Sequence, residues 1–167
     1  MFSSSDDGLF EMHELNRKLD NRVRQAILFG TDRRLDPRRV LARQVEHQVR
    51  ELLEERGFTV TGTSHQERFD LLVQGIRVEV KASRWYDRYI CNLHGNDADV
   101  LVWACVDGAA HYFVIPFQDV RGLTVIKVQS HNPREYCGKW MRWYGAWDLI
   151  DELVASGRNA WQPALWS

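Results

Sequence analysis

Residues 68–83 read Arg-Phe-Asp-Leu-Leu-Val-Gln-Gly-Ile-Arg-Val-Glu-Val-Lys-Ala-Ser, two aliphatic and β-branched runs joined by Gln74-Gly75. Two residues with glycine second have the length and chemistry of a tight β-hairpin turn. If these two residues form the loop, residues whose numbers sum to 149 face each other across the ladder. The sequence therefore predicts an antiparallel hairpin in which Asp70 faces Glu79.

The two faces of this hairpin differ sharply, because side chains alternate along a strand. One face is wholly apolar and is predicted to be core: Leu71, Val73, Ile76, Val78 and Val80. The other face is mostly polar and carries Arg68, Asp70, Leu72, Arg77, Glu79, Lys81 and Ser83.

Two carboxylates that face each other repel, since opposed Cβ atoms lie only ~5 Å apart. A divalent cation is one compensation, because Mg²⁺ is commonly held by one or two carboxylates together with water and phosphate oxygens. Lys81, on the same face, would then orient or deprotonate a water, or neutralise charge on a phosphate. The alternative is an ordinary solvated face on which Arg68, Arg77 and Lys81 neutralise the acids.

Asp70 followed by Glu79-Val80-Lys81 on the next strand resembles the PD-(D/E)xK nuclease superfamily, although Phe69 stands where the family has proline. The resemblance covers about residues 40–128 and implies a restriction-endonuclease-like fold. It further implies that Mg²⁺ or Mn²⁺ is held by Asp70, Glu79 and the Val80 carbonyl, and that Lys81 serves the nucleophile. A Glu on the preceding helix joins the metal site in that family, and Glu46 is the candidate here.

That helix is predicted to begin at Asp36-Pro37, with Asp as N-cap and Pro at the first helical position, and to run to Arg56 before Gly57. Its buried face comprises Leu41, Val45, Val49, Leu52 and Leu53. Glu46 lies at the edge of this face, either directed toward the sheet or paired at the surface with Arg50 at i+4.

The first 35 residues are expected to form a separate segment. Residues 1–8 are small, polar and acidic, which is typical of disorder, and apolar residues then recur at helical spacing over 10–28. This helical arm is open to three uses: docking on the core, dimerisation, or contact with nucleic acid. Residues 36–167 are expected to form the nuclease-like core, with a C-terminal helix over 147–155.

Basic residues are concentrated from Arg17 to Arg50, where ten Lys or Arg stand against four Asp or Glu. Helix N-termini favour phosphate through their free N–H groups and dipole. The predicted nucleic-acid-binding residues are Arg33, Arg34, Arg38 and Arg39 around the helix start, together with Ser83 and Arg84 after the hairpin.

Further strands are expected at 58–62, 99–106, 111–115 and 123–128, whereas residues 89–93 suit either a strand or a helical turn. The run 99–106 is apolar on both faces, as in a central strand covered on both sides. The fold class is therefore α/β: a mixed sheet of about five to six strands flanked by helices, with an N-terminal helical arm. The interleaved cations and tryptophans of 139–144 suit a packed helix or a nucleic-acid platform.

Composition restricts the class of protein. A net charge of −1 over 167 residues argues against a uniformly basic nucleic-acid binder. The three cysteines have no CxxC or other metal spacing, which suits a reducing compartment, and the histidines lack the spacing of a zinc helix. No run is long and apolar enough to cross a membrane, so a cytoplasmic or nucleoid-associated protein is expected.

We therefore expect a metal-dependent DNA endonuclease, with a homodimer supplying the two sites that duplex cutting requires. Restriction, homing, repair and junction resolution remain open. The alternatives are a non-catalytic nucleic-acid-binding or assembly protein on the same fold, and a structural adaptor.

Overall fold

The computed structural model describes residues 36–63, 67–94 and 97–157. The predicted N-terminal arm, with Arg33 and Arg34, lies outside these residues. The regular elements, in chain order, are α2 (Pro37–Glu55), β1 (Val60–Gly62), β2 (Leu71–Val73), β3 (Ile76–Arg84), β4 (Tyr89–Asn92), β5 (Val100–Asp107), β6 (Ala109–Pro116), α3 (Phe117–Val120), β7 (Val125–Val128), the 3-10 helices η1 (Pro133–Glu135) and η2 (Lys139–Trp143), and α4 (Asp148–Ser156).

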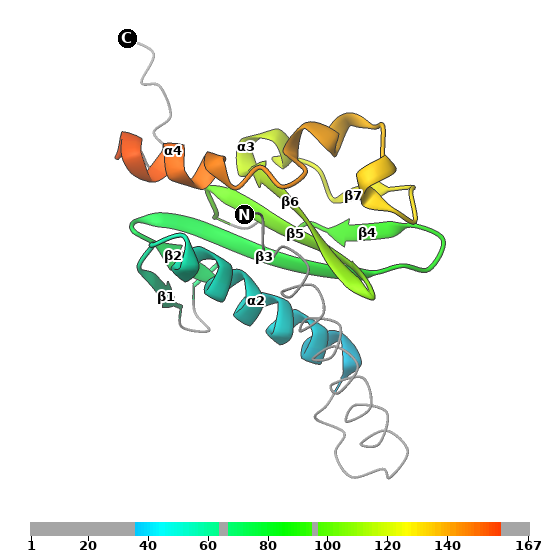
Figure 1. Ribbon diagram of the computed structural model, residues 1–167, viewed down its shortest axis with the longest axis horizontal. Helices are drawn as coiled ribbons and strands as arrows, with labels where there is room; N and C mark the ends of the chain where they lie inside the picture. The colour runs from blue at the N-terminus through cyan, green and yellow to red at the C-terminus, as the bar shows by residue number, and fades with distance from the viewer. Residues whose placement is uncertain (1–35, 64–66, 95–96, 158–167) are drawn as a thin grey trace, which may run out of the picture.

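The main sheet has five strands in the order β1-β2-β3-β5-β6 (Figure 1). β3 and β5 are parallel, whereas every other neighbouring pair is antiparallel. The expected α/β fold with a mixed sheet is thus confirmed. One detail of the expectation was wrong: the strand expected at 123–128 does not join the main sheet but pairs, as β7, with β4 in a separate two-stranded sheet.

The hairpin prediction is confirmed in its turn and in its first three pairs. Leu71 pairs with Val78, and the ladder closes at Val73 and Ile76. Gln74 and Gly75 both have positive φ, 47° and 94°, as a type I′ turn requires at its two central positions. Local turn chemistry therefore fixes the register that places the candidate site.

The predicted central strand is β5, and its first six residues, 100–105, are all buried. It lies between β3 and β6, and both of its faces are covered. The strand expected at 111–115 is longer than predicted, because β6 pairs with β5 along its whole length from Ala109 to Pro116. The strands expected at 58–62 and 123–128 are shorter, β1 and β7.

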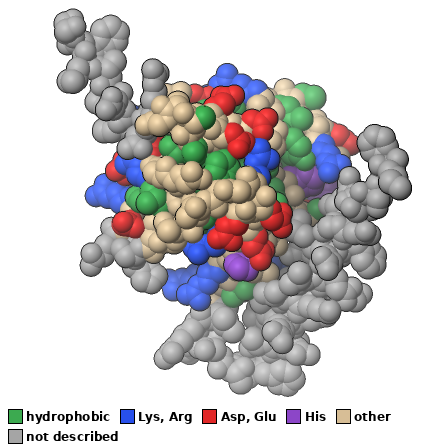
Figure 2. All heavy atoms as spheres, turned by 60° about the vertical axis from the view of Figure 1, so that its left-hand side comes forward, with side chains coloured by type: hydrophobic (Ala, Val, Ile, Leu, Met, Phe, Trp, Pro, Cys, Tyr) green, Lys and Arg blue, Asp and Glu red, His purple; other side chains and the backbone are tan. Residues whose placement is uncertain are grey.

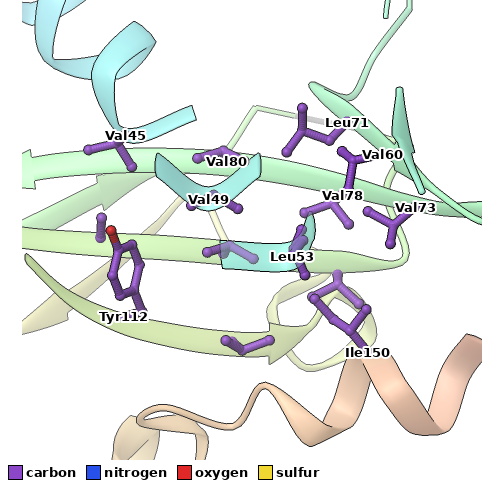
Figure 3. Close-up of a cluster of buried hydrophobic side chains, with 14 of the residues drawn as sticks. Val45, Val49, Leu53, Val60, Leu71, Val73, Val78, Val80, Tyr112 and Ile150 are labelled. Carbon is purple, nitrogen blue, oxygen red and sulfur yellow. The ribbon is translucent and has the colours of Figure 1, made fainter. Parts of the chain in front are cut away.

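Helix α2 covers one face of the sheet (Figure 1). Its start is as predicted: the Asp36 carboxylate accepts a 2.9 Å hydrogen bond from the backbone N–H of Arg38, and Pro37 occupies the first turn. Figure 3 shows the apolar stripe of α2 packed on β3, with Ile150 of α4 completing this first core. The buried α2 residues are Leu41, Val45, Val49 and Leu53, while Leu52 packs half-buried against the same core.

The opposite face of the sheet packs on a second core. Trp103 and Phe113 of the sheet meet Tyr89 of β4 and side chains of β7, α3 and η2. The C-terminal helix begins one residue later than expected, at Asp148. Trp143 belongs to η2, so the tryptophans of 139–144 lie on a 3-10 helix that closes this core.

Among residues 36–63, 67–94 and 97–157, no helix is long and apolar enough to cross a membrane.

Candidate active site at the start of β2 and the middle of β3

Strand β2 leaves the ladder at Asp70. The outermost pair of β2 with β3 is Leu71 with Val78, and the Asp70 N–H donates a 3.0 Å hydrogen bond to the carbonyl of Val78. Leu71 packs in the first core whereas Phe69 packs against the second, although residues two apart share one face of a regular strand. The predicted direct pair of Asp70 with Glu79 was therefore wrong, because the chain turns over at Asp70 to reach the other core.

The Asp70 carboxylate instead reaches the backbone of β3. Its Oδ2 accepts a 2.7 Å hydrogen bond from the N–H of Val80, on the peptide that links Glu79 to Val80. Asp70 is half-buried. The Asp70 carboxylate therefore lies beside the peptide that follows Glu79, and the Val80 N–H of this peptide fixes the position of the Asp70 side chain.

Glu79 lies on the face of β3 that is directed toward the second core. This is the polar face of the hairpin, which the alternative interpretation expected to be solvated. It is only 4% exposed, and its carboxylate forms an ion pair with the Nζ of Lys81, whose side chain is 30% exposed. A buried carboxylate is unfavourable without a partner, so Lys81 stabilises Glu79 in this position. The interpretation of this face as a solvated surface was wrong for Glu79, because Glu79 is buried and Cys91 of β4, a member of the second core, interacts electrostatically with it.

Arg77 does not take part in this neutralisation. Its guanidinium donates two hydrogen bonds to Asp99, of 3.1 and 2.9 Å, and pairs at 2.7 Å with Asp97. Asp99, 3% exposed, also accepts from the Arg77 N–H and so joins the starts of β3 and β5. The alternative in which Arg77 compensates the two acids was therefore wrong.

Glu46 lies half-buried on α2 and interacts electrostatically with Asp70. Burial raises the pKa of Glu46, and the negative charge of Asp70 raises it further, whereas Arg50 and Arg43 oppose the change. Glu46 therefore interacts electrostatically with both Asp70 on the sheet side and Arg50 on its own helix, so both orientations considered for it from the sequence have a counterpart in the structure.

The oxygen donors of Asp70, Glu79 and the Val80 carbonyl match the preference of Mg²⁺ and Mn²⁺ for hard ligands. Within the described part of the chain, no group of three or more His, Cys, Asp or Glu side chains is placed to hold a metal. A cation here would rely on two carboxylates with a peptide carbonyl, water and substrate oxygens. It would compete with Lys81 for Glu79.

Three of the predicted nucleic-acid-binding residues line one groove. Arg38, Ser83 and Arg84 border a hollow of about 370 Å³ between the start of α2, the end of β3 and β4. The Ser83 hydroxyl accepts a 2.8 Å hydrogen bond from Trp103 Nε1, so it also holds the second core. Arg39 is exposed on the same turn of α2 as Arg38. The groove also includes Tyr86 and Arg88, which lie between β3 and β4 and are not among the predicted binding residues.

The charge on α2 is divided along its length. No acid lies in its first turn and no base in its last, the reverse of what the helix dipole favours. Exposed acids occupy its C-terminal half, at Glu51, Glu54 and Glu55. Figure 2, which brings the left-hand side of Figure 1 forward, shows acidic side chains in patches over the visible surface. Only the N-terminal end of α2 therefore suits a polyanion.

The similarity of this chain to known proteins lies in its fold. No family model matches the sequence, and no curated protein does. Among solved structures the chain is similar to the bacterial homing endonuclease I-Ssp6803I, with 20% sequence identity and a TM-score of 0.61. The match covers 71% of this chain and 94% of that one, so the sheet and helices described above have the fold of that structure.

Proposed function

We propose that this protein is a metal-dependent DNA endonuclease that hydrolyses phosphodiester bonds at Asp70, Glu79 and Lys81. The observation that carries the proposal is the 2.7 Å hydrogen bond from the Val80 N–H to the Asp70 carboxylate. It anchors Asp70 beside the strand segment that bears Glu79 and Lys81. The similarity to a homing endonuclease supports the same reaction class.

Asp70, Glu79 and the Val80 carbonyl would hold Mg²⁺ or Mn²⁺, which when bound supplies a polarised water and a positive charge for the phosphate. The protein's own residues position the groups that would hold the cation and the water. The Val80 N–H holds the Asp70 carboxylate, and β3 directs Glu79 and Lys81 to one face. Glu46, whose pKa is raised next to Asp70, is suited to hold a proton or a water-mediated contact at this site.

Lys81 has two partners in this proposal. It now neutralises Glu79, and a cation at the carboxylates would compete for that carboxylate and release the ammonium toward the nucleophile. An amine next to a water and a phosphate can orient the water, accept its proton, or stabilise the phosphate charge. The residues thus resemble the PD-(D/E)xK pattern in the order and chemistry of its acids and lysine, with Phe69 in place of its proline.

DNA is proposed to approach over the N-terminal end of α2, where Arg38, Arg39 and Arg84 contact phosphates. The acidic C-terminal half of the helix makes the opposite approach unfavourable. Cutting both strands of a duplex takes two sites, so we propose a homodimer, in the cytoplasm or associated with the nucleoid.

The test is incubation of the pure protein with supercoiled, linear and branched DNA, with Mg²⁺, with Mn²⁺ and with EDTA. Cleavage that requires the divalent cation and disappears in both Asp70→Asn and Glu79→Gln is the expected result. A light-scattering measurement of mass in solution tests the homodimer independently.

A non-catalytic DNA-binding protein on the same fold is the second candidate. The observation in its favour is the ion pair between Lys81 and Glu79, which gives both side chains a structural role. It predicts DNA binding that is unchanged by EDTA and no cleavage of any topology, which separates it from the first proposal in the same experiment.

A further inference from the structure

The groove at the end of β3 begins directly after Lys81. Ala82, Ser83 and Arg84 form part of its wall, and the start of α2, the turn between β3 and β4, and the outer side of β4 form the rest. Successive residues of a strand advance by about 3.3 Å, so Ser83 lies only about 7 Å along β3 from Lys81. A DNA strand with its scissile phosphate at Lys81 would therefore place a neighbouring nucleotide at the groove.

The charged part of the groove suits a phosphate. Arg38, Arg84 and Arg88 all line it, against a single acid, Asp87, which forms an ion pair with Arg88. Arginine is the side chain best matched to phosphate oxygens, because its planar fork donates several hydrogen bonds. This excess of positive charge favours an anionic ligand.

The apolar part of the groove does not suit a phosphate. Leu41 and Ala82 line it, as do Ile90, which is 40% exposed, and Tyr86, which is 85% exposed. A phosphate track along a duplex needs cations and hydrogen-bond donors, whereas an aromatic ring beside aliphatic side chains suits the flat face of a base. The volume of about 370 Å³ falls within the range of small-ligand sites.

Base faces are hidden in a stacked duplex and become accessible only where a nucleotide leaves the stack. We propose that this groove holds one unstacked nucleotide of the substrate, with its base against Tyr86 and Ile90 and its phosphate on Arg38 and Arg84. The preferred substrate is then DNA with an unpaired nucleotide next to the scissile phosphate, such as a flap, a gap or a branch. This inference rests on the proposed endonuclease function, since Lys81 sets the position of the scissile bond.

Photocross-linking tests the contact directly. A single 5-iodouracil is placed at the unpaired position of a flapped DNA, or at the matching paired position of a blunt duplex, and Ca²⁺ replaces Mg²⁺. The expected adduct forms with the flapped DNA only, maps by mass spectrometry to the peptide containing Tyr86, and is absent in Tyr86→Leu. An adduct that maps elsewhere overturns the proposal.

Affinity measurements use two matched pairs. Tyr86→Ala should weaken binding of flapped DNA about tenfold or more, the scale of one base stacked on an aromatic ring, and leave blunt duplex unchanged. Ile90→Asp should weaken flapped DNA in the same way, whereas Leu123→Asp, at an equally 40% exposed apolar position outside the groove, should not. Equal losses for both DNAs would overturn the proposal in favour of a general phosphate contact.

Cleavage in Mg²⁺ distinguishes failure of this inference from failure of the proposed function. If flapped and blunt DNA are cut equally and Tyr86→Ala changes neither rate, the groove proposal fails and the endonuclease stands. If nothing is cut but the adduct at Tyr86 forms, the groove is a nucleotide site and the endonuclease fails. If Tyr86→Ala changes only the oligomeric state, the groove belongs to a contact with a second copy of the chain.

Discussion

The carboxylate of Asp70 is bound to the backbone N–H of Val80, at 2.7 Å, and not to a side chain of the facing strand. Because this N–H belongs to the strand that carries Glu79 and Lys81, the contact fixes the position of Asp70 relative to both. Asp70 thus has two properties, its negative charge and its role as hydrogen-bond acceptor for Val80. Asp70→Asn removes the charge alone, whereas Asp70→Ala removes both.

Asp70→Asn should abolish cation-dependent cleavage and weaken Mn²⁺ binding, because a neutral amide is a poor ligand for a divalent cation. Its stability should stay near that of the wild type, since the amide oxygen can still accept from Val80. Asp70→Ala should lose the same activity and also about 1–3 kcal/mol of stability, because the Val80 N–H loses its acceptor. Calorimetric Mn²⁺ titration and urea unfolding measure the two effects. Asp148→Asn, at an exposed acid on α4, is the control. Unchanged Mn²⁺ affinity in both Asp70→Asn and Glu79→Gln would eliminate the metal site.

Lys81→Ala should lose on the order of 10²-fold or more in cleavage rate, the scale of a general acid–base group, while DNA binding in Ca²⁺ is retained. Metal affinity should be retained or increased, because Lys81 no longer competes for Glu79. Lys81→Arg should restore little of the rate, because a guanidinium keeps the charge but does not readily release a proton. Single-turnover cleavage at saturating enzyme gives the rate. Near-normal cleavage by Lys81→Ala would reduce this lysine to the partner of a buried acid.

Glu46 gives a pH-dependent prediction. Burial and the charge of Asp70 raise the pKa of Glu46 in the folded protein above the ordinary value of 4.5. At a pH between the ordinary pKa and the raised pKa, the folded protein therefore binds more protons than the unfolded chain. Stability therefore falls as the pH rises through that window. Glu46→Gln cannot ionise, so its unfolding temperature should equal that of the wild type below the window and exceed it at neutral pH. Calorimetric unfolding over a pH series checks this, with the exposed Glu54→Gln on the same helix as control. Identical curves for Glu46→Gln and wild type would contradict it.

The two arginines at the start of α2 give a prediction about salt. Arg38→Ala combined with Arg39→Ala should weaken binding to blunt duplex DNA of any sequence and flatten the dependence of log affinity on log salt by about 2. Neutralising Glu54 and Glu55, at the other end of the helix, should leave the slope unchanged. Fluorescence anisotropy titrations over a range of salt provide the slopes. If affinity held while the assembly dissociated, this end of α2 would be a subunit interface.

The sequence by itself determined what local interactions control. Gln74-Gly75 fixed the turn and the first three pairs of the β2–β3 hairpin, Asp36-Pro37 fixed the start of α2, and the unbroken apolar run from Val100 identified the central strand. Each of these depends on backbone preferences and side-chain periodicity within a few residues. Such interactions can be read without knowing what lies across the core.

Only the tertiary structure decided which faces are covered and how the acids meet. The sequence could not show that β4 and β7 form their own sheet, with Cys91 of β4 close enough to interact electrostatically with Glu79. Nor could it show that the chain turns over at Asp70 to carry Phe69 into the second core. It also could not bring Arg38 of α2 and Tyr86 to one groove, since they lie 48 residues apart. The physical reason is that burial, strand order and side-chain partners depend on the packing of distant segments, which have no signal in the local pattern of residues.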